Sequence, residues 1–223
     1  MNIQELNRIA LKMVEPGTGI LAADESTATI GKRFESINTE STYEKRRDWR
    51  EMLFRTHEAM SNHISGVILY DETIRQKTAD GTSLVELIKS TNTLPGIKVD
   101  TGTTPLAGRP QESITQGLDG LRERLTEYYK LGARFAKWRA VLKVDVEKHL
   151  PSDLAVHENA VTLARYASIC QNNGLVPIVE PEILMDGTHT SIQARDATIN
   201  VLSVVYRELL RHHVDMNCTL LKP

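Results

Sequence analysis

Three lysines in this 223-residue sequence stand where a charge needs an explanation. Lys98, Lys137 and Lys222 each follow apolar residues, in the segments "GIKVD", "RFAKWR" and "CTLLKP". Burying such a charge without a partner is unfavourable. The simpler interpretation, that each charge only begins a surface loop, therefore explains these three lysines poorly, and we expect them to have a function.

A lysine of this kind can act as a nucleophile. When it is partly desolvated and lies near other cations, its pKa is lowered, because both conditions disfavour the ammonium form. The free amine can then attack a carbonyl and form a Schiff base. Dehydration of the carbinolamine needs a proton carrier, such as a nearby carboxylate. Lys222 with Glu180, in "VPIVEPE", provides such a pair, so the residues predict a Schiff-base enzyme that acts on a carbonyl compound.

A polar segment, "DESTATIGKR" (24–33), is a candidate phosphate site. It follows an apolar run and precedes an expected helix, and its hydroxyls, backbone amides and cations suit a phosphate group. The alternative is an ordinary helix N-cap followed by a solvated basic turn, and the pattern alone does not decide between the two. The seven histidines form no H-E-x-x-H or comparable pair, so no metal or other cofactor is predicted.

Short apolar runs must position these side chains. They show little alternation of apolar and polar residues, which is typical of strands covered on both faces in a parallel sheet. The runs begin at Gly19, Gly66, Gly96, Arg134, Val176 and Cys218. Helical patterns lie between them, and we expect helices over 41–60, 118–132, 152–174 and 188–213.

Alternating strands and helices predict parallel strands joined by right-handed crossovers. The last four runs begin near residues 94, 135, 176 and 217, a regular spacing that favours a (β/α)₈ barrel over a doubly wound sheet. In such a barrel the active site lies at the carboxyl ends of the strands. Alternate strand residues share a face, so Lys137 should point with Arg139, and Glu180 with Glu182. No flexible linker interrupts the chain, which predicts one domain over 1–223.

Composition narrows the function classes. The chain is 40% hydrophobic and 25% charged, with a net charge of −2, which gives no indication of nucleic acid or of an anionic membrane surface. The apolar runs are too short to span a membrane, and the N-terminus lacks the pattern of a signal peptide. Cys170 and Cys218 are too few and too far apart for a disulfide framework or a zinc site. A cytoplasmic location is expected.

Several segments together resemble class I fructose-1,6-bisphosphate aldolase, collinearly from about Ile9 to Pro223. They are "GILAADES", "GIKVD", "LDGLRER", "FAKWR", "ARYASICQ", "VPIVEPEIL" and "CTLLKP". The resemblance implies a (β/α)₈ TIM barrel, usually a homotetramer, that uses no metal or cofactor. It also implies an aldehyde-lyase of glycolysis and gluconeogenesis. This enzyme reversibly cleaves fructose 1,6-bisphosphate, a sugar phosphate, into dihydroxyacetone phosphate and glyceraldehyde 3-phosphate.

The resemblance also implies catalytic roles for five residues. Lys222 matches the Schiff-base lysine, and Glu180 matches the general acid/base that dehydrates the carbinolamine. Glu182 helps to orient and polarise the site. Asp24 matches the carboxylate near the C4 hydroxyl and the nascent enamine. Lys137 is the adjacent cation that lowers the pKa of the nucleophile.

Six further residues match positions of the family that bind the substrate and its phosphates. Arg139 braces the adjacent lysine of the same segment. Lys98, with Ser26 and Thr29, matches the pocket for the 6-phosphate. Thr29 stands where well-known members have a serine, and it keeps the hydroxyl. Two arginines match substrate-contacting arginines: Arg33 and Arg46.

The end of the chain departs from the family pattern. A barrel of this type has eight strands and about 250 residues, whereas six strands are predicted here. The resemblance implies two more strand–helix units after Pro223, whose serine- and glycine-rich loop and arginine hold the 1-phosphate, and a mobile tail. We expect the chain to be truncated just after the Schiff-base lysine, as a fragment, a partial gene model or a real product.

Two other functions compete with this hypothesis. A chain of this length could be catalytically dead and act only as a binding or interaction protein. A different Schiff-base barrel enzyme, such as a transaldolase or a deoxyribose-phosphate aldolase, is the third interpretation. The segments "FAKWR" and "VEPE" and the phosphate-type segment 24–33 argue against that third interpretation.

Overall fold

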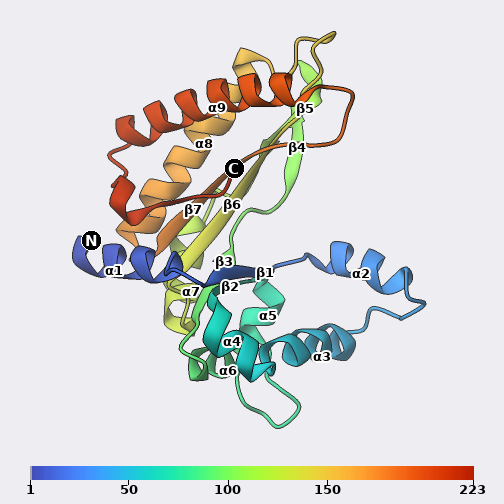
Figure 1. Ribbon diagram of the computed structural model, residues 1–223, viewed down its shortest axis with the longest axis vertical. Coiled ribbons are helices and arrows are strands. Elements are labelled where there is room, and N and C mark those ends of the chain that lie inside the picture. Colours follow the sequence, from blue (N-terminus) through green and yellow to red (C-terminus); the bar gives the residue numbers. More distant parts are fainter. Residues whose placement is uncertain (1) are drawn as a thin grey trace.

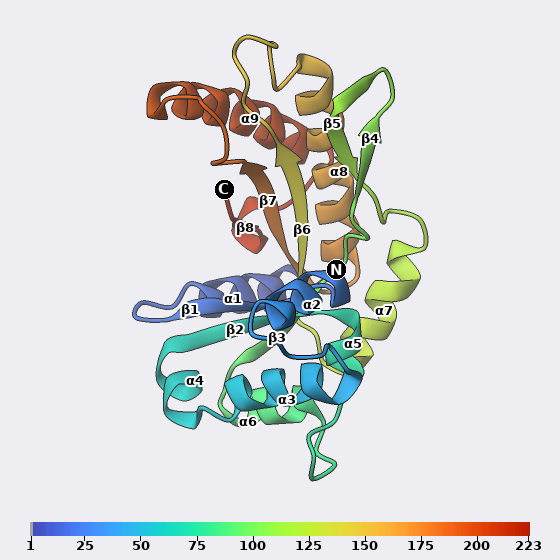
Figure 2. The ribbon, with the colours of Figure 1, turned by 90° about the vertical axis from the view of Figure 1, so that its right-hand side faces the viewer.

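The computed structural model describes residues 2–223, which form a curled six-stranded parallel sheet with helices around it (Figures 1 and 2). Its strand order is β1–β2–β3–β6–β7–β8, and every neighbouring pair in it is parallel. Each of the six predicted apolar runs overlaps one of these strands. Their bounds are β1 Gly19–Ala23, β2 Ile64–Leu69, β3 Leu94–Lys98, β6 Phe135–Leu142, β7 Val176–Ile183 and β8 Leu220–Leu221.

Helices connect and cover the strands. α8 packs against β6 and β7, and α9 lies beside α8 and also contacts β7 (Figure 1). Helices form where the sequence predicts them over 118–132, 152–174 and 188–213, and Gly132, with a φ of 114°, ends α7. The bounds are α1 Ile3–Met13, α2 Thr27–Glu35, α3 Tyr43–Phe54, α4 His57–His63, α5 Asp71–Arg75, α6 Leu84–Ser90, α7 Leu121–Leu131, α8 Asp153–Asn172 and α9 Ser191–Arg211, with a 3₁₀ turn η1 at Met216–Cys218.

The single helix expected over 41–60 is wrong, because the structure breaks the segment between α3 and α4. Thr56 leaves the helical conformation, with φ −72° and ψ 71°. Its hydroxyl donates to the carbonyl of Leu53, a local bond that competes with the helical ladder. The break gives α3 and α4 separate directions around the outside of the sheet.

An antiparallel hairpin was not expected from the sequence. Strands β4 (Thr103–Leu106) and β5 (Arg109–Thr115) form a separate two-stranded sheet between β3 and α7 in the chain. The hydroxyl of Thr115 donates to the carbonyl oxygen of Arg139 at 2.7 Å, and Asn159 of α8 donates to the carbonyl of Ser113 at 3.0 Å. The hairpin is therefore fixed to the end of β6 by contacts between distant parts of the chain.

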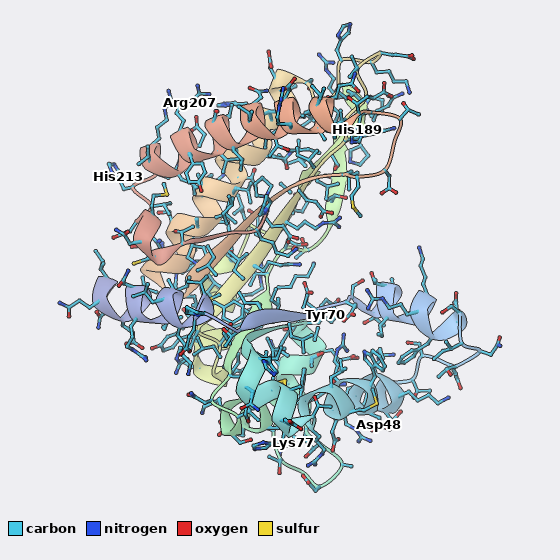
Figure 3. The ribbon with its side chains drawn as sticks, viewed as in Figure 1. Asp48, Tyr70, Lys77, His189, Arg207 and His213 are labelled. Carbon is cyan, nitrogen blue, oxygen red and sulfur yellow. The ribbon has the colours of Figure 1, made fainter. Side chains whose placement is uncertain are left out.

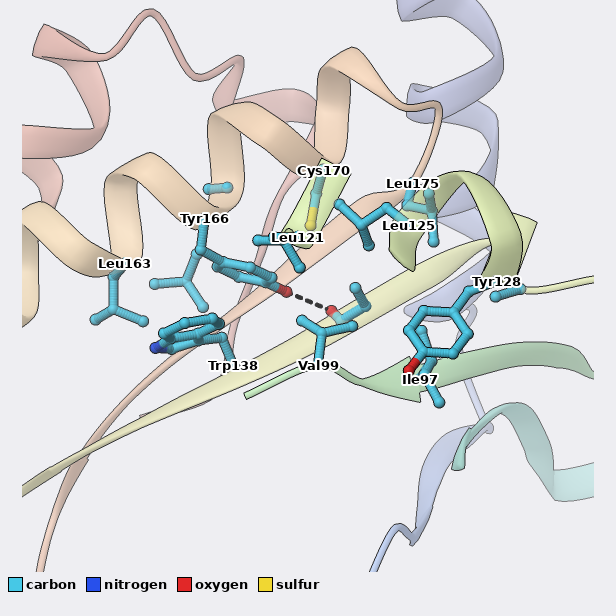
Figure 4. Packing of buried hydrophobic residues seen from close by; sticks show 14 of the residues in the cluster. Ile97, Val99, Leu121, Leu125, Tyr128, Trp138, Leu163, Tyr166, Cys170 and Leu175 are labelled. Atoms are coloured by element: carbon cyan, nitrogen blue, oxygen red, sulfur yellow. Dashed lines mark hydrogen bonds between the residues drawn. The ribbon is translucent and has the colours of Figure 1, made fainter. Parts of the chain in front are cut away.

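Two apolar clusters fill the two faces of the sheet. On the outer face, Tyr166 of α8 packs against Trp138 of β6, with ring centroids 5.4 Å apart (Figure 4). The hydroxyl of Tyr166 lies 2.7 Å from the carbonyl oxygen of Ala136 and 3.2 Å from that of Ile178, so it joins β6 to β7. These are the two strands that carry most of the predicted catalytic residues.

The second cluster closes the amino ends of the strands. Leu6, Ile9 and Met13 of α1 are buried there with Phe135, which begins β6. A Cβ atom built on Gly96 of β3 would lie 2.2 Å from the Phe135 ring, so only glycine fits at that position. Among the described residues, no helix combines the length and apolar character that a membrane-spanning helix needs.

Candidate active site

A pocket of about 930 Å³ opens at the carboxyl ends of the sheet strands. Figure 3 labels Tyr70, which follows β2 and belongs to the pocket wall. Of the predicted site residues, all of which the structure describes, only Arg46 lies outside this wall. The others are Asp24, Ser26, Thr29, Arg33, Lys98, Lys137, Arg139, Glu180, Glu182 and Lys222.

Charged side chains alternate from β8 across β7 and β6 to the end of β1. Lys222 donates a hydrogen bond to Glu180 Oε1. The other oxygen, Glu180 Oε2, lies 3.4 Å from Lys137 Nζ. Lys137 Nζ in turn lies 2.5 Å from Asp24 Oδ2. Two lysines and two carboxylates thus neutralise one another, which makes the burial of Asp24, Lys137 and Glu180 possible.

Backbone pairing brings these side chains into reach. In the β6–β7 ladder Lys137 is paired with Ile178, and Arg139 with Glu180. The backbone N–H of Lys222 donates to the carbonyl of Val179 at 2.9 Å, which continues the β7–β8 ladder and places its side chain beside that of Glu180. As predicted, Lys137 and Arg139 lie on the same face of β6, and Glu180 and Glu182 lie on the same face of β7, since all four line the pocket.

Burial and charge determine the state of Lys137. Burial by itself would lower its pKa, but the negative charges of Asp24 and Glu180 outweigh burial, so the pKa of Lys137 is raised above its usual value. This side chain is therefore an ammonium ion between two carboxylates. It can supply a fixed positive charge next to Lys222.

Glu180 is the most enclosed carboxylate of the group. Its side chain is 3% exposed, whereas that of Lys222 is 47% exposed at the pocket mouth. Within residues 2–223, Glu180 Oε2 accepts no hydrogen bond, although the ammonium group of Lys137 lies 3.4 Å from it. A buried oxygen without a donor, beside an amine, is placed to take or give a proton to a bound molecule.

Arg139 and Glu182 form the outer part of the same rim. The guanidinium Nε of Arg139 donates to Glu182 Oε2, and this bond is the main reason why the pKa of Glu182 is lowered. The contact of Arg139 is therefore with Glu182, while its bracing of Lys137 stays a prediction. Both charges face the pocket.

In the segment 24–33, the helix N-cap is present and also lies in the pocket wall. Ser26 caps α2, and its Oγ accepts a hydrogen bond from the backbone N–H of Thr29 at 3.3 Å. The two hydroxyl oxygens lie 3.0 Å apart. Arg33 donates to the carboxylate of Glu25. Cap and anion site are compatible here, because the hydrogen bond between Ser26 and Thr29 uses one of their two hydroxyl hydrogens, and the cation Arg33 lies in the same wall.

Arg46 has a different environment from the one that its predicted role requires. It lies on α3, and its guanidinium makes two hydrogen bonds of 2.9 and 2.6 Å to the carboxylate of Glu72 on α5. It also donates to the carbonyl of Ser41 at 2.8 Å. Substrate contact by Arg46 stays a prediction, since in this conformation its donors hold α3 to α5.

The structure adds residues to the pocket that sequence reasoning gave no role. Asp100 accepts a hydrogen bond of 2.6 Å from Lys98. The sequence could have indicated this contact, because residues two apart in an extended segment point to the same side. Arg124, in the segment "LDGLRER", donates to the carbonyl of Val99 at 2.9 Å. Further wall residues are Glu25, Asp71, Arg75, Glu127 and Tyr128.

The arrangement of histidine, cysteine and acidic side chains bears on metal binding. Over residues 2–223, no group of three or more histidine, cysteine, aspartate or glutamate side chains is arranged to hold a metal ion. The pocket wall provides the amine of Lys222, seven carboxylates and six further cations. Such a set can form and dehydrate a carbinolamine and bind an anionic carbonyl compound.

Comparison with known proteins gives a consistent result. The model of the family "Fructose-bisphosphate aldolase class-I" matches residues 5–223. Fructose-bisphosphate aldolase of Echinococcus multilocularis is 57% identical over 221 residues, 99% of this chain and 60% of that protein. The Dictyostelium discoideum enzyme is 55% identical, over 98% of this chain and 61% of that protein. Cytosolic fructose-bisphosphate aldolase 6 of Arabidopsis thaliana is 59% identical, over 93% and 57%.

A solved structure is similar over the same region. It is fructose-bisphosphate aldolase from Plasmodium falciparum, in complex with TRAP and a small-molecule inhibitor. The TM-score is 0.97 at 52% sequence identity, and the alignment covers 99% of this chain and 63% of that one. The chain described here thus spans about 60% of the length of the curated relatives that it matches.

Proposed function

This chain belongs to the class I fructose-bisphosphate aldolase family, and from that premise we propose that it cleaves fructose 1,6-bisphosphate reversibly through a Schiff base on Lys222. The products are dihydroxyacetone phosphate and glyceraldehyde 3-phosphate. One observation carries the proposal: the amine of Lys222 contacts the buried carboxylate of Glu180, whose second oxygen faces the ammonium group of Lys137 at 3.4 Å. The proposed mechanism needs neither a metal nor another cofactor.

Formation of the Schiff base follows from this contact. Glu180 is placed to accept the proton that leaves Lys222, which frees the amine to attack the C2 carbonyl and form a C–N bond. The same carboxyl group then returns the proton to the carbinolamine oxygen, which departs as water and leaves the iminium ion. Lys137 contributes positive charge beside the nucleophile.

Cleavage of the C3–C4 bond uses the next carboxylate in the row. Asp24 accepts the proton of the C4 hydroxyl while the bond breaks, and the electron pair moves toward the iminium nitrogen to give an enamine. Lys137, 2.5 Å from Asp24, holds that carboxylate in place. Protonation of the enamine and hydrolysis of the iminium then release the second product and the free lysine.

Binding of the substrate is proposed for the rest of the wall. We assign the 6-phosphate to Lys98, Ser26 and Thr29, which share one pocket wall near the N-terminus of α2. Arg139 with Glu182 would orient the substrate at the outer rim. Two arginines, Arg33 and Arg46, are proposed as further substrate contacts.

The barrel fold, oligomeric state, cellular location and metabolic role of the chain are also proposals. The six parallel strands curl with their carboxyl ends around one pocket, which supports the first six strands of a (β/α)₈ barrel in a single domain over 1–223. A homotetramer in the cytoplasm, working in glycolysis and gluconeogenesis on sugar phosphates, is proposed from the family. Cytosolic isozymes among the relatives support the location.

Covalent trapping tests the function. The protein is incubated with dihydroxyacetone phosphate and borohydride, and its intact mass and a peptide map are measured. We expect one adduct on Lys222, lost in Lys222→Met and kept in Lys89→Met, a matched change at a lysine on α6 that pairs with Glu86. An adduct that persists in Lys222→Met, or no adduct in the unaltered protein, would contradict the proposal.

A further inference from the structure

The lysine proposed to bind phosphate already has an anionic partner. Lys98 Nζ donates to Asp100 Oδ1 at 2.6 Å and to the backbone carbonyl of Asp100 at 3.1 Å. An ammonium group has three N–H donors, so two of the three are directed to one residue. Any phosphate that binds Lys98 must share it with Asp100 or displace it.

Asp100 is held firmly in this position. Its side chain is 5% exposed, and its Oδ1 also accepts a hydrogen bond of 3.3 Å from the backbone N–H of Gly102. The backbone N–H of Thr101 donates to the carbonyl of Gln116, and that of Gln116 donates to the carbonyl of Gly102, both at 2.9 Å. Arg124 donates to the carbonyl of Val99, also at 2.9 Å. The carboxylate therefore cannot swing away at little cost when a ligand arrives.

The second oxygen of Asp100 is without a donor. Asp100 Oδ2 is buried and accepts no hydrogen bond from the described part of the chain, residues 2–223. A buried carboxylate oxygen in that state is unfavourable. Among residues 2–223, the cation in direct contact with this carboxylate is Lys98, whose side chain is 18% exposed.

We propose that Asp100 is an internal competitor for Lys98, whose carboxylate limits how tightly the pocket binds a phosphate group. In the ligand-free pocket the carboxylate neutralises the lysine. When a phosphate binds, it takes over at least one N–H donor of Lys98 and lies close to a second negative charge. This proposal rests on the proposed function in one respect: it assumes that the natural anion is the phosphate group of a sugar phosphate.

Electrostatics sets the direction of the effect. Asn in place of Asp100 keeps the shape and an acceptor for Lys98 and Gly102, but removes the negative charge. A unit charge at about 4–6 Å shifts the protonation equilibrium of a neighbouring group by about one to three powers of ten, and we expect an effect of similar size on the binding of an anion. Because Lys98 is partly open to solvent, the lower end applies, and we expect phosphate to bind about tenfold more tightly in Asp100→Asn.

Calorimetric titration at fixed pH and ionic strength tests this. The probes are inorganic phosphate and a non-cleavable hexitol 1,6-bisphosphate. Both should bind about tenfold more tightly to Asp100→Asn. Asp71→Asn is the matched control, since Asp71 lines the same pocket but is paired with Arg75 and Tyr128. Its affinities should stay within about twofold of the unaltered protein.

A double variant separates competition from a general charge effect. In a Lys98→Met background, Asp100→Asn should change phosphate affinity less than about twofold, because the competed group is gone. Equal tightening without Lys98 would overturn the proposal. So would unchanged or weaker binding in Asp100→Asn, which would show that Asp100 orients the lysine for its ligand. Asp100→Ser replaces the Asn variant if a melting curve shows that the latter is unfolded.

The proposed function and this inference fail in different ways. A missing borohydride adduct on Lys222 contradicts the aldolase mechanism. Inorganic phosphate has no carbonyl group and forms no Schiff base, so its response to Asp100→Asn is read whether or not the adduct forms.

Discussion

Replacing Glu180 by Gln tests the central contact of the pocket. The change keeps the shape of the side chain and removes its charge, which in the protein lies against Lys222 and 3.4 Å from Lys137. Removing one partner of a buried ion pair usually destabilises a protein by about 3–5 kcal/mol. Here Lys137 keeps Asp24 at 2.5 Å and Lys222 is 47% exposed. We therefore expect a loss of about 3 kcal/mol in the free energy of unfolding.

The catalytic effect of the same change should be larger. Among residues 2–223, Glu180 is the carboxylate in contact with Lys222, so its loss removes the group placed to take the proton of Lys222 and to protonate the carbinolamine. General acid/base groups contribute about 10²–10⁴-fold to rate. Formation of the borohydride-trapped adduct with dihydroxyacetone phosphate should slow by about 100-fold or more. The adduct that does form should still map to Lys222.

Two measurements check this prediction. Urea unfolding gives the change in stability, and quenched trapping at several times gives the rate of adduct formation. Glu86→Gln, at an exposed carboxylate on α6 paired with Lys89, is the control and should leave both unchanged. Adduct formation by folded Glu180→Gln at the unaltered rate would refute the role given to Glu180, because the proton would then come from elsewhere.

Three further predictions concern stability, and urea unfolding measures each. Gly96→Ala places a Cβ 2.2 Å from the Phe135 ring and should lower the free energy of unfolding by about 3 kcal/mol or more. Adding Phe135→Leu should restore part of this loss, and a double variant with no gain in stability would contradict the clash. Tyr166→Phe loses the hydroxyl that joins β6 to β7 and should lower the free energy of unfolding by about 1–3 kcal/mol. A change near zero would contradict this role of the hydroxyl. Hydrogen bonding from Arg139 lowers the pKa of Glu182, so the ionised form contributes stability that is lost as pH falls below its ordinary value of 4.5. Glu182→Gln should therefore be less stable at pH 7 by a margin that shrinks below pH 4.5, and a margin independent of pH would count against this.

Local sequence was sufficient for the strands of the sheet. β2, β3, β6 and β7 are mostly buried, so their continuous apolar character marked them in the sequence. The two edge strands β1 and β8 are apolar as well, although the structure leaves them partly exposed. It was insufficient for the β4–β5 hairpin, whose residues are mostly polar and exposed. That hairpin depends on the bonds of Thr115 to Arg139 and of Asn159 to Ser113, which join parts of the chain 24 and 46 residues apart.

In the candidate site, too, some features follow from local sequence and others only from the tertiary structure. Alternation along one strand is local, so the sequence by itself determined that Lys137 and Arg139 share a face, and likewise Glu180 and Glu182. Which charges meet was decided only when the sheet curled: Lys222 reaches Glu180 across 42 residues, and Lys137 reaches Asp24 from another strand. The partner of Lys98 is two residues away, yet burial of that pair needed the whole pocket wall. Ion pairs depend on distances in space and on the exclusion of water, and neither is encoded by local pattern.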